Sequence, residues 1–209
     1  MTLNESPVTT TAAEVRRLAV EGALELTPRV FPDDRGLFVA TYQSSIFTAA
    51  TGRPLPLVQA SHSVSRRGVV RGIHFTTTPP GTAKYVYCTS GRALDLVVDL
   101  RVGSPTFGRW DSVLLDQTHF RSTYLPVGVG HAFVALEDRT VMSYLMTNGY
   151  VPEHEQAVSP LDPALGLPID LEVEPILSER DTAAPTLTEA LELGLLPDYL
   201  ASVAVEETW

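Results

Sequence analysis

The sequence predicts an all-β fold, namely an antiparallel barrel, sandwich or jelly roll, from three observations. Short segments rich in Val, Tyr, Leu and Thr follow one another between residues 57 and 150, among them KYVYCTS, ALDLVVDL and HAFVAL. Turn sequences such as TPPG, TSGR and LEDRT separate them. No long helical period runs through this stretch, and closely spaced strands of this kind are typical of antiparallel architectures.

The two ends of the chain differ from this central stretch. SSIFTAATG, residues 44–52, predicts a short helix with a serine cap and a glycine stop, and TLTEALELG, residues 186–194, predicts a second one. FPDDRG, residues 31–36, predicts a turn. We expect one domain over residues 1–209, with a flexible leader over 1–16 and a C-terminal tail over 186–209.

The amino-acid composition restricts the kinds of molecule that the protein can bind. The chain has 15 Lys and Arg against 25 Asp and Glu, a net charge of −10, which argues against broad binding to nucleic acid or anionic membranes. A few well-placed arginines can still hold a phosphorylated small molecule. The single cysteine, Cys88, favours a reducing compartment, and the start of the chain has no signal-peptide pattern. We therefore expect a cytoplasmic protein without a membrane span.

The histidines are the natural candidates for chemistry. His74 lies in VVRGIHF and His131 follows a glycine-rich turn, whereas His119 and His154 lie in polar segments where we expect them to be solvated. Each one, taken alone, could equally be an ordinary hydrogen-bonded histidine. A metal-binding small barrel would offer two histidines one residue apart, but the residue two after His74 is Thr76, so we predict no metal.

A basic cluster remains, formed by Arg71, His74 and Lys84. Residues of these types can hold a phosphorylated ligand. They can also remove a proton next to a carbonyl group and stabilise the enolate that forms. The residues alone leave both readings open.

Several segments resemble the dTDP-4-dehydrorhamnose 3,5-epimerase family in order and spacing. They are QASHSVSRRGVVRGIHF, GTAKYVYC, ALDLVVDLRVGSPTFGRW, YLPVGVGHAF and VMSYLMTNGYVPEHE, together with FPDDRGLF near the start and SERDTAAP near the end. The resemblance covers residues 17–185 and is strongest to the antibiotic-deoxysugar branch, of the vancomycin-group 5-epimerase type. It implies a cupin-type jelly roll, a homodimer in which strands cross between subunits, no cofactor, and a dTDP-4-keto-6-deoxyhexose substrate.

The resemblance also assigns residues. His74 matches the general base, Asp181 the carboxylate that orients it, Lys84 the cation at the C-4 keto oxygen, and Tyr144 the proton donor on the opposite face of the sugar. The implied substrate-binding residues are Arg35 and Arg71 at the diphosphate, with Gln59, Asp95, His131 and Tyr150 lining the pocket. Asp95, Tyr144 and Tyr150 could instead be ordinary strand residues.

The chain departs from the family pattern at Ala40, Ser61, Thr76 and Leu145. These departures touch the pocket lining and leave the proton-transfer set intact. Inversion at two carbons requires the sugar to present two protons, one after the other, to the same base. Small changes in the side chains that line the pocket can block one of these two orientations. We expect C-5 as the main centre of epimerisation, with C-3 as a second.

Four other functions remain alternatives from the sequence. A 3-epimerase or a 3,4-ketoisomerase would share the fold, and the ketoisomerase would need no donor on the opposite face. A non-catalytic sugar-binding jelly roll would need a cavity but no base. A metal dioxygenase of the cupin type would need a metal that we do not expect.

Overall fold

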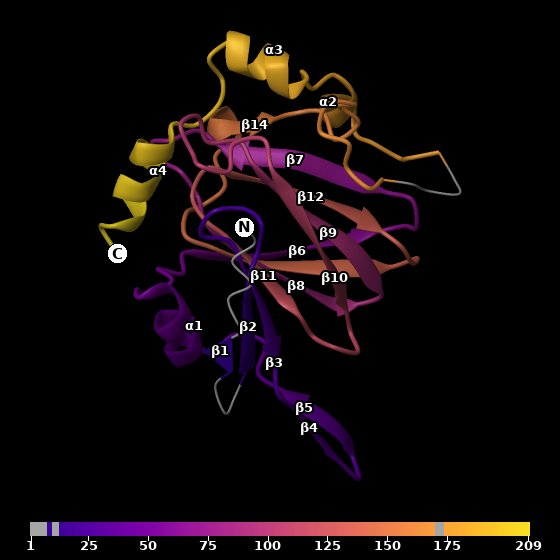
Figure 1. Cartoon of the computed structure of the whole chain (residues 1–209). Helices are drawn as coiled ribbons and strands as arrows, with labels where there is room; N and C mark the ends of the chain where they lie inside the picture. The colour runs from indigo at the N-terminus through magenta and orange to yellow at the C-terminus, as the bar shows by residue number, and fades with distance from the viewer. Residues whose placement is uncertain (1–7, 10–12, 170–173) are drawn as a thin grey trace, which may run out of the picture.

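Two antiparallel sheets face each other and enclose the interior of the molecule (Figure 1). The computed structural model describes residues 8–9, 13–169 and 174–209. The larger sheet has seven strands in the order β1-β2-β3-β11-β8-β13-β6, and the smaller has five in the order β10-β9-β12-β7-β14. Neighbouring strands come from distant parts of the chain, as in a jelly roll. The predicted all-β, cupin-type jelly roll is confirmed.

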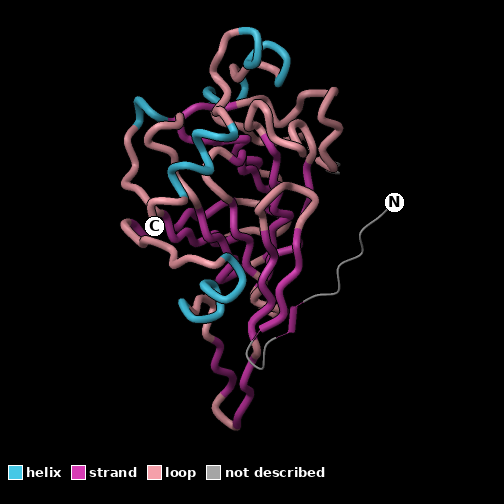
Figure 2. Tube along the Cα trace, turned by 60° about the vertical axis from the view of Figure 1, so that its left-hand side comes forward, coloured by secondary structure: helices cyan, strands magenta, loops and turns pink. Residues whose placement is uncertain are grey.

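The strand bounds locate each sequence segment in the sheets. The larger sheet consists of β1 (Val8–Thr9), β2 (Ala13–Arg17), β3 (Leu24–Pro28), β11 (Ser122–Leu125), β8 (Lys84–Ser90), β13 (Thr140–Met146) and β6 (Gln59–Ser65). The smaller consists of β10 (Trp110–Asp116), β9 (Arg92–Asp99), β12 (Val129–Ala135), β7 (Val70–Thr76) and β14 (Glu155–Ala157). A separate hairpin, β4 (Val30–Asp33) and β5 (Gly36–Val39), projects away from both sheets (Figures 1 and 2).

Short helices lie outside the sheets. They are α1 (Ser44–Thr51), α2 (Glu179–Thr182), α3 (Leu187–Glu192) and α4 (Tyr199–Glu206), with a 3₁₀ turn η1 (Pro152–His154). Both predicted helices are present: α1 ends at Gly52 in the left-handed conformation, and α3 begins with a capping box between Thr186 and Glu189. In the described part of the chain, none of the helices has the length and apolar character needed to cross a membrane.

Three local predictions need correction. Gln43, rather than a serine, occupies the N-cap of α1 and makes no side-chain capping bond. Residues 13–16 of the expected leader belong to β2, where Ala13 and Val15 are buried, because β2 pairs with β3. Residues 1–7 and 10–12 of that leader lie outside the described residues. The expected turn over residues 31–36 is confined to 34–35, since its flanks form the β4–β5 hairpin.

Three clusters of buried side chains form the core. The first lies between the sheets and includes Val86, Val97, Phe133 and Met142. The second covers the outer face of the smaller sheet with residues such as Ile73, Leu96 and Ala190, and the third joins the larger sheet to α1 through Phe47, Tyr85 and Tyr124. Because the terminal segments cover the outer sheet faces, the space between the sheets is left for one cluster and a cavity.

A buried ion pair ties the C-terminal segment to the barrel. Arg101 donates to both oxygens of Asp99 at 2.8 Å, and Ser104 and Thr106 donate to the same carboxylate. Burial disfavours the charged Asp99, but Arg101 and the two hydroxyls hold its pKa below the usual value. The Arg101 guanidinium also lies 5.1 Å from the ring centre of Tyr199, at the start of α4.

Replacing Asp99 by Asn should lower the free energy of unfolding by about 3–5 kcal/mol, because it leaves the buried Arg101 charge uncompensated. Urea unfolding followed by circular dichroism measures this change. Asp33→Asn is the matched control, since Asp33 and its partner Arg35 are exposed, and it should leave the midpoint unchanged. Equal midpoints for the two variants would contradict a structural role for the buried pair.

Candidate active site

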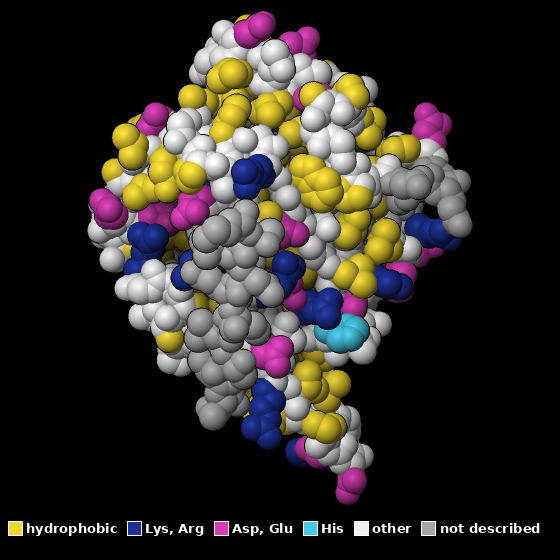
Figure 3. Space-filling model, viewed as in Figure 1, with side chains coloured by type: hydrophobic (Ala, Val, Ile, Leu, Met, Phe, Trp, Pro, Cys, Tyr) yellow, Lys and Arg dark blue, Asp and Glu magenta, His cyan; other side chains and the backbone are white. Residues whose placement is uncertain are grey.

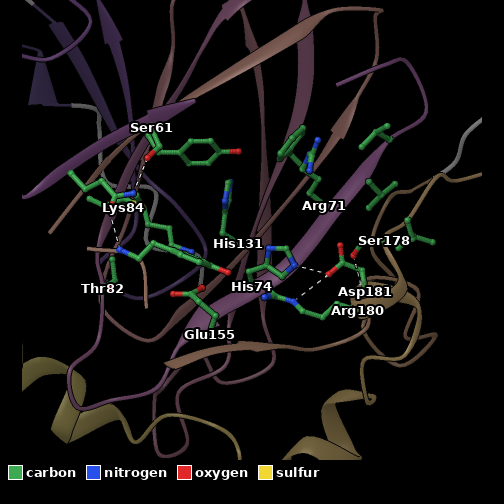
Figure 4. A pocket seen from close by; sticks show the side chains of 18 of the residues that line it. Ser61, Arg71, His74, Thr82, Lys84, His131, Glu155, Ser178, Arg180 and Asp181 are labelled. Atoms are coloured by element: carbon green, nitrogen blue, oxygen red, sulfur yellow. Dashed lines mark hydrogen bonds and ion pairs between the residues drawn. The ribbon is translucent and has the colours of Figure 1, made fainter. Parts of the chain in front are cut away.

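A cavity of about 750 Å³ opens between the two sheets and holds most of the predicted site residues. Eight of the ten line it, namely Gln59, Arg71, His74, Lys84, His131, Tyr144, Tyr150 and Asp181. Figure 4 shows Lys84 on one side of this space and Asp181 on the other, with His131 and His74 between them. The cavity therefore brings together residues from both sheets and from α2.

Gly72 permits the close approach of the two strands that carry the histidines. His74 on β7 is directly paired with His131 on β12. Gly72 has a φ of +118°, and a Cβ atom there would lie 2.4 Å from the His131 carbonyl oxygen and 2.6 Å from the Ala132 Cα. Any side chain would therefore clash with the β12 backbone. The glycine of the RGIH segment is thus required to set the two imidazoles side by side.

His74 and Asp181 form a carboxylate–imidazole pair. The distance from His74 Nε2 to Asp181 Oδ1 is 2.6 Å, and Asp181 is 2% exposed. Asp181 is placed by α2, whose N-cap residue Ser178 accepts a hydrogen bond from the Asp181 backbone N–H. A short parallel bridge between Val69 and Ile176 holds the segment before α2 against the start of β7. With Nε2 bound to the carboxylate, Nδ1 is the ring nitrogen left for chemistry.

The charges around His74 set its protonation. Burial lowers the pKa of His74 below its ordinary value, while the hydrogen bond and the charge of Asp181 raise it, and Arg180 and Lys84 lower it. For Asp181, burial raises the pKa, but the bonds to His74 and Ser178 outweigh burial and lower it overall. The imidazole is therefore neutral and available as a base at neutral pH.

The facing wall belongs to the larger sheet and carries Lys84 and Tyr144. Burial lowers the pKa of Lys84, and the nearby Glu155 carboxylate opposes that effect. Burial raises the pKa of Tyr144 to about 12, so its hydroxyl keeps its proton. The Tyr144 ring meets the His131 ring edge-on, with 6.0 Å between the ring centres. A neutral base and a protonated phenol thus lie on opposite walls of one cavity.

Two of the ten predicted residues do not line this cavity. Asp95 is fully buried behind His131, and its Oδ1 lies 2.6 Å from His131 Nε2, so it contacts the pocket only through that histidine. Arg35 lies in the turn of the projecting hairpin, where its side chain is 90% exposed and paired with Asp33. Neither residue can touch a ligand in the cavity of its own chain.

Other cavity residues were not expected from the sequence. Glu155 on β14 and Arg180 beside Asp181 add one charge of each sign, and Thr82, Met146 and Asn148 complete the wall. Thr76 donates a hydrogen bond of 2.9 Å to Glu155. Glu155 directly follows His154, yet only Glu155 of these two residues lines the cavity. A carboxylate that becomes a pocket residue through strand pairing leaves no local sequence signal.

The remaining histidines lie apart from the cavity lining. The His119 side chain is 54% exposed and contacts Asp116, close to the solvated position expected. His154 is half-buried, and its Nδ1 is buried without a hydrogen-bond partner among the described residues, so the expectation of a solvated side chain is wrong there. Across residues 13–169 and 174–209, no group of three or more His, Cys, Asp or Glu side chains has a geometry that could hold a metal ion.

Comparison with known proteins identifies the family. The family model described as dTDP-4-dehydrorhamnose 3,5-epimerase matches residues 17–189. A dTDP-4-dehydrorhamnose 3,5-epimerase of Mycolicibacterium smegmatis is 47% identical, over 92% of this chain and 95% of the relative. A dTDP-4-dehydro-6-deoxyglucose 3-epimerase of Streptomyces bikiniensis is 46% identical, over 88% and 94%. The chain belongs to the dTDP-4-dehydrorhamnose 3,5-epimerase family and is an epimerase, an enzyme of the isomerase class.

A solved structure agrees with this assignment. The crystal structure of NovW, a 4-keto-6-deoxy sugar epimerase from the novobiocin biosynthetic gene cluster of Streptomyces spheroides, superposes with a TM-score of 0.89. Its sequence is 46% identical, and the match covers 95% of this chain and 99% of that one. The chain is therefore similar to epimerases of antibiotic deoxysugars in both fold and sequence.

Asp181→Asn should shift the His74 titration further to low pH. The Asp181 carboxylate raises the pKa of His74, so its removal leaves burial and the charges of Arg180 and Lys84 to act alone. Titration of the imidazole proton signals by NMR measures the midpoint. Asp33→Asn, far from the cavity on the hairpin, should leave the midpoint as in the parent protein. An unchanged or raised midpoint in Asp181→Asn would contradict the pairing.

Proposed function

We propose that the chain epimerises a dTDP-4-keto-6-deoxyhexose at C-5, with C-3 as a second centre, without a cofactor. The observation that carries this proposal is the placement of a base and an acid on facing walls of one cavity. His74 comes from β7 of the smaller sheet and Tyr144 from β13 of the larger sheet. Inversion of a carbon centre requires a proton to leave one face and another to arrive on the opposite face.

The proposed steps balance without a redox change. Nδ1 of His74 takes the proton from the carbon next to the C-4 ketone, and the electron pair of the broken C–H bond forms an enolate. The Lys84 ammonium stabilises the negative charge that develops on the C-4 oxygen. Tyr144 then gives its proton to the other face of the carbon, and Asp181 stabilises the imidazolium of His74.

The anionic end of the substrate needs cations in an acidic protein. Arg71 lines the cavity and can hold the diphosphate, because a guanidinium group matches paired phosphate oxygens. Ser65 accepts a hydrogen bond of 3.1 Å from Arg71 Nε, which leaves part of the guanidinium free. The backbone N–H of Tyr150 donates a hydrogen bond of 2.9 Å to the side-chain oxygen of Gln59. Both residues line the cavity and can contact the nucleotide.

A second candidate is an epimerase acting at C-3 alone. The relative from Streptomyces bikiniensis is named as a 3-epimerase, and so is a dTDP-4-dehydrorhamnose 3-epimerase of Streptomyces niveus that is 49% identical to this chain. Relatives named as 3,5-epimerases are similarly close. The same cavity and the same base would serve either centre, so the two candidates differ in how the sugar is presented.

Incubation with dTDP-4-keto-6-deoxyglucose in D₂O should remove the C-5 and C-3 proton signals, because each abstracted proton is replaced by deuterium. Proton NMR follows the two signals separately. Loss of the C-3 signal alone would establish the 3-epimerase, and loss of the C-5 signal alone a 5-epimerase. No exchange at either carbon would contradict the proposed function.

His74→Ala should lower the exchange rate by about 10²–10⁴-fold, the contribution of a positioned base, and leave dTDP binding almost intact. Tyr144→Phe should keep exchange and lose inversion. Calorimetry with dTDP is the folding control. Full inversion by Tyr144→Phe would contradict the two-faced mechanism, and unchanged exchange in His74→Ala would contradict the assignment of His74 as the base.

We also propose a homodimer in which the hairpin β4–β5 completes the cavity of a second copy. Its apolar side chains Phe31, Leu37 and Phe38 are between 47% and 67% exposed, a high cost for a lone hairpin in water. Figure 3 shows such side chains on the projecting hairpin, with charges near its tip. Arg35 in the turn could then reach the partner's diphosphate, which its own cavity does not allow.

The chain should have about twice its monomer mass of 22.7 kDa by light scattering. Arg35→Ala should raise the KM for the dTDP-sugar by about tenfold, the loss of one charged contact, with kcat little changed. Arg109→Ala, at an exposed position away from the hairpin, is the matched control. A monomer with full activity would contradict this proposal.

A further inference from the structure

The inward face of β6 carries a row of polar side chains, and one of them, Ser63, has no role in the proposed function. Its exposure alternates along the strand: Ala60, His62 and Val64 are exposed, while the residues between them are half-buried or buried. Those inward residues are Gln59, Ser61, Ser63 and Ser65. A half-buried edge strand would ordinarily place apolar side chains on this face. The serines on this face therefore require an explanation other than packing in the core.

Each serine of this row contacts a different side chain of the site. Ser61 accepts a hydrogen bond of 2.9 Å from Gln59, and Ser65 accepts one of 3.1 Å from Arg71. The Ser63 hydroxyl lies 3.3 Å from the hydroxyl of Tyr144. Ser63 itself is absent from the cavity lining, so it reaches the site only through Tyr144.

The Tyr144 hydroxyl depends on this contact. Among the residues that the structure describes, Ser63 is its only hydrogen-bond partner. The ring is fixed by packing against the core cluster between the sheets and by the edge of His131. Packing sets the place of the ring, but a hydrogen bond must set the direction of the O–H bond.

We propose that Ser63 is a positioning residue for proton donation: it donates its hydroxyl proton to the Tyr144 oxygen and leaves the Tyr144 proton directed into the cavity. This inference rests on the proposed function. When Tyr144 gives its proton to the carbanionic carbon, the phenolate that remains keeps the hydrogen bond from Ser63. The direction of the Ser63 effect on the pKa of Tyr144, a lowering, agrees with such support.

Loss of the Ser63 hydroxyl should affect one half of the reaction. Removal of the substrate proton by His74 does not involve Ser63, so exchange should continue. Reprotonation by Tyr144 should slow. More of the enolate should then take up a deuteron from the His74 side, and the carbon concerned should keep its original configuration. The ratio of exchange to inversion therefore reports the role of Ser63 directly.

The test measures exchange and inversion together in D₂O, with dTDP-4-keto-6-deoxyglucose, for the parent protein and for Ser63→Ala, Ser63→Thr and Ser143→Ala. Ser63→Ala should raise the exchange-to-inversion ratio by about 10- to 100-fold, the value of a hydrogen bond to a charged group. Ser63→Thr keeps the hydroxyl and should restore the parent ratio. Ser143→Ala removes a serine next to Tyr144 whose hydroxyl faces Thr89, and should change nothing.

The outcomes separate this inference from the proposed function. A parent protein that exchanges and inverts, with an unchanged ratio in Ser63→Ala, would overturn the role of Ser63 alone. Equal losses of exchange and inversion in Ser63→Ala, not restored by Ser63→Thr, would also overturn it and indicate a structural role. A parent protein that does not exchange would overturn the proposed function and this inference with it.

Discussion

The site depends on one hydrogen bond between residues that are 107 positions apart, His74 and Asp181. The imidazole is fixed by a sheet and the carboxylate by a four-residue helix near the C-terminal end. Their contact requires the segment before α2 to lie along β7, which the bridge between Val69 and Ile176 provides. After α2 the chain continues into α3, whose Leu187 and Ala190 pack on the outer face of the smaller sheet that also carries β7.

Electrostatics inside the cavity differ from those of the whole protein. The chain has a net charge of −10, yet Arg71, Lys84 and Arg180 face the cavity against Glu155 and Asp181. Asp181 is already paired with His74. Even with both carboxylates counted, the cations outnumber the anions in the cavity, which favours an anionic ligand in a protein whose net charge is negative. Three cations gathered on the wall of one cavity are enough to reverse the local sign.

The fold and eight of the ten expected site residues, those that line the cavity, could be predicted from the sequence. Strand composition and turns predict the sheets, whereas the set of His74, Lys84 and Tyr144 follows from the resemblance to the epimerase family and not from the residues alone. Glu155 was missed because strand pairing with Thr76 brings it into the cavity. Asp95 was expected on the wall, but a buried carboxylate behind a histidine has the same sequence pattern. The α4 helix was missed, although Asp198 before it is a normal N-cap.

The cavity shares a wall with the core, and this has a consequence for how such enzymes diverge. Phe133 and Tyr144 belong to the cluster between the sheets and also line the cavity. A change of volume at Met142 or Val86, deep in that cluster, therefore alters the gap between the two sheets and with it the reach from His74 to Tyr144. The spacing between the walls of the cavity can thus change through ordinary core substitutions, while every residue that lines the cavity stays the same.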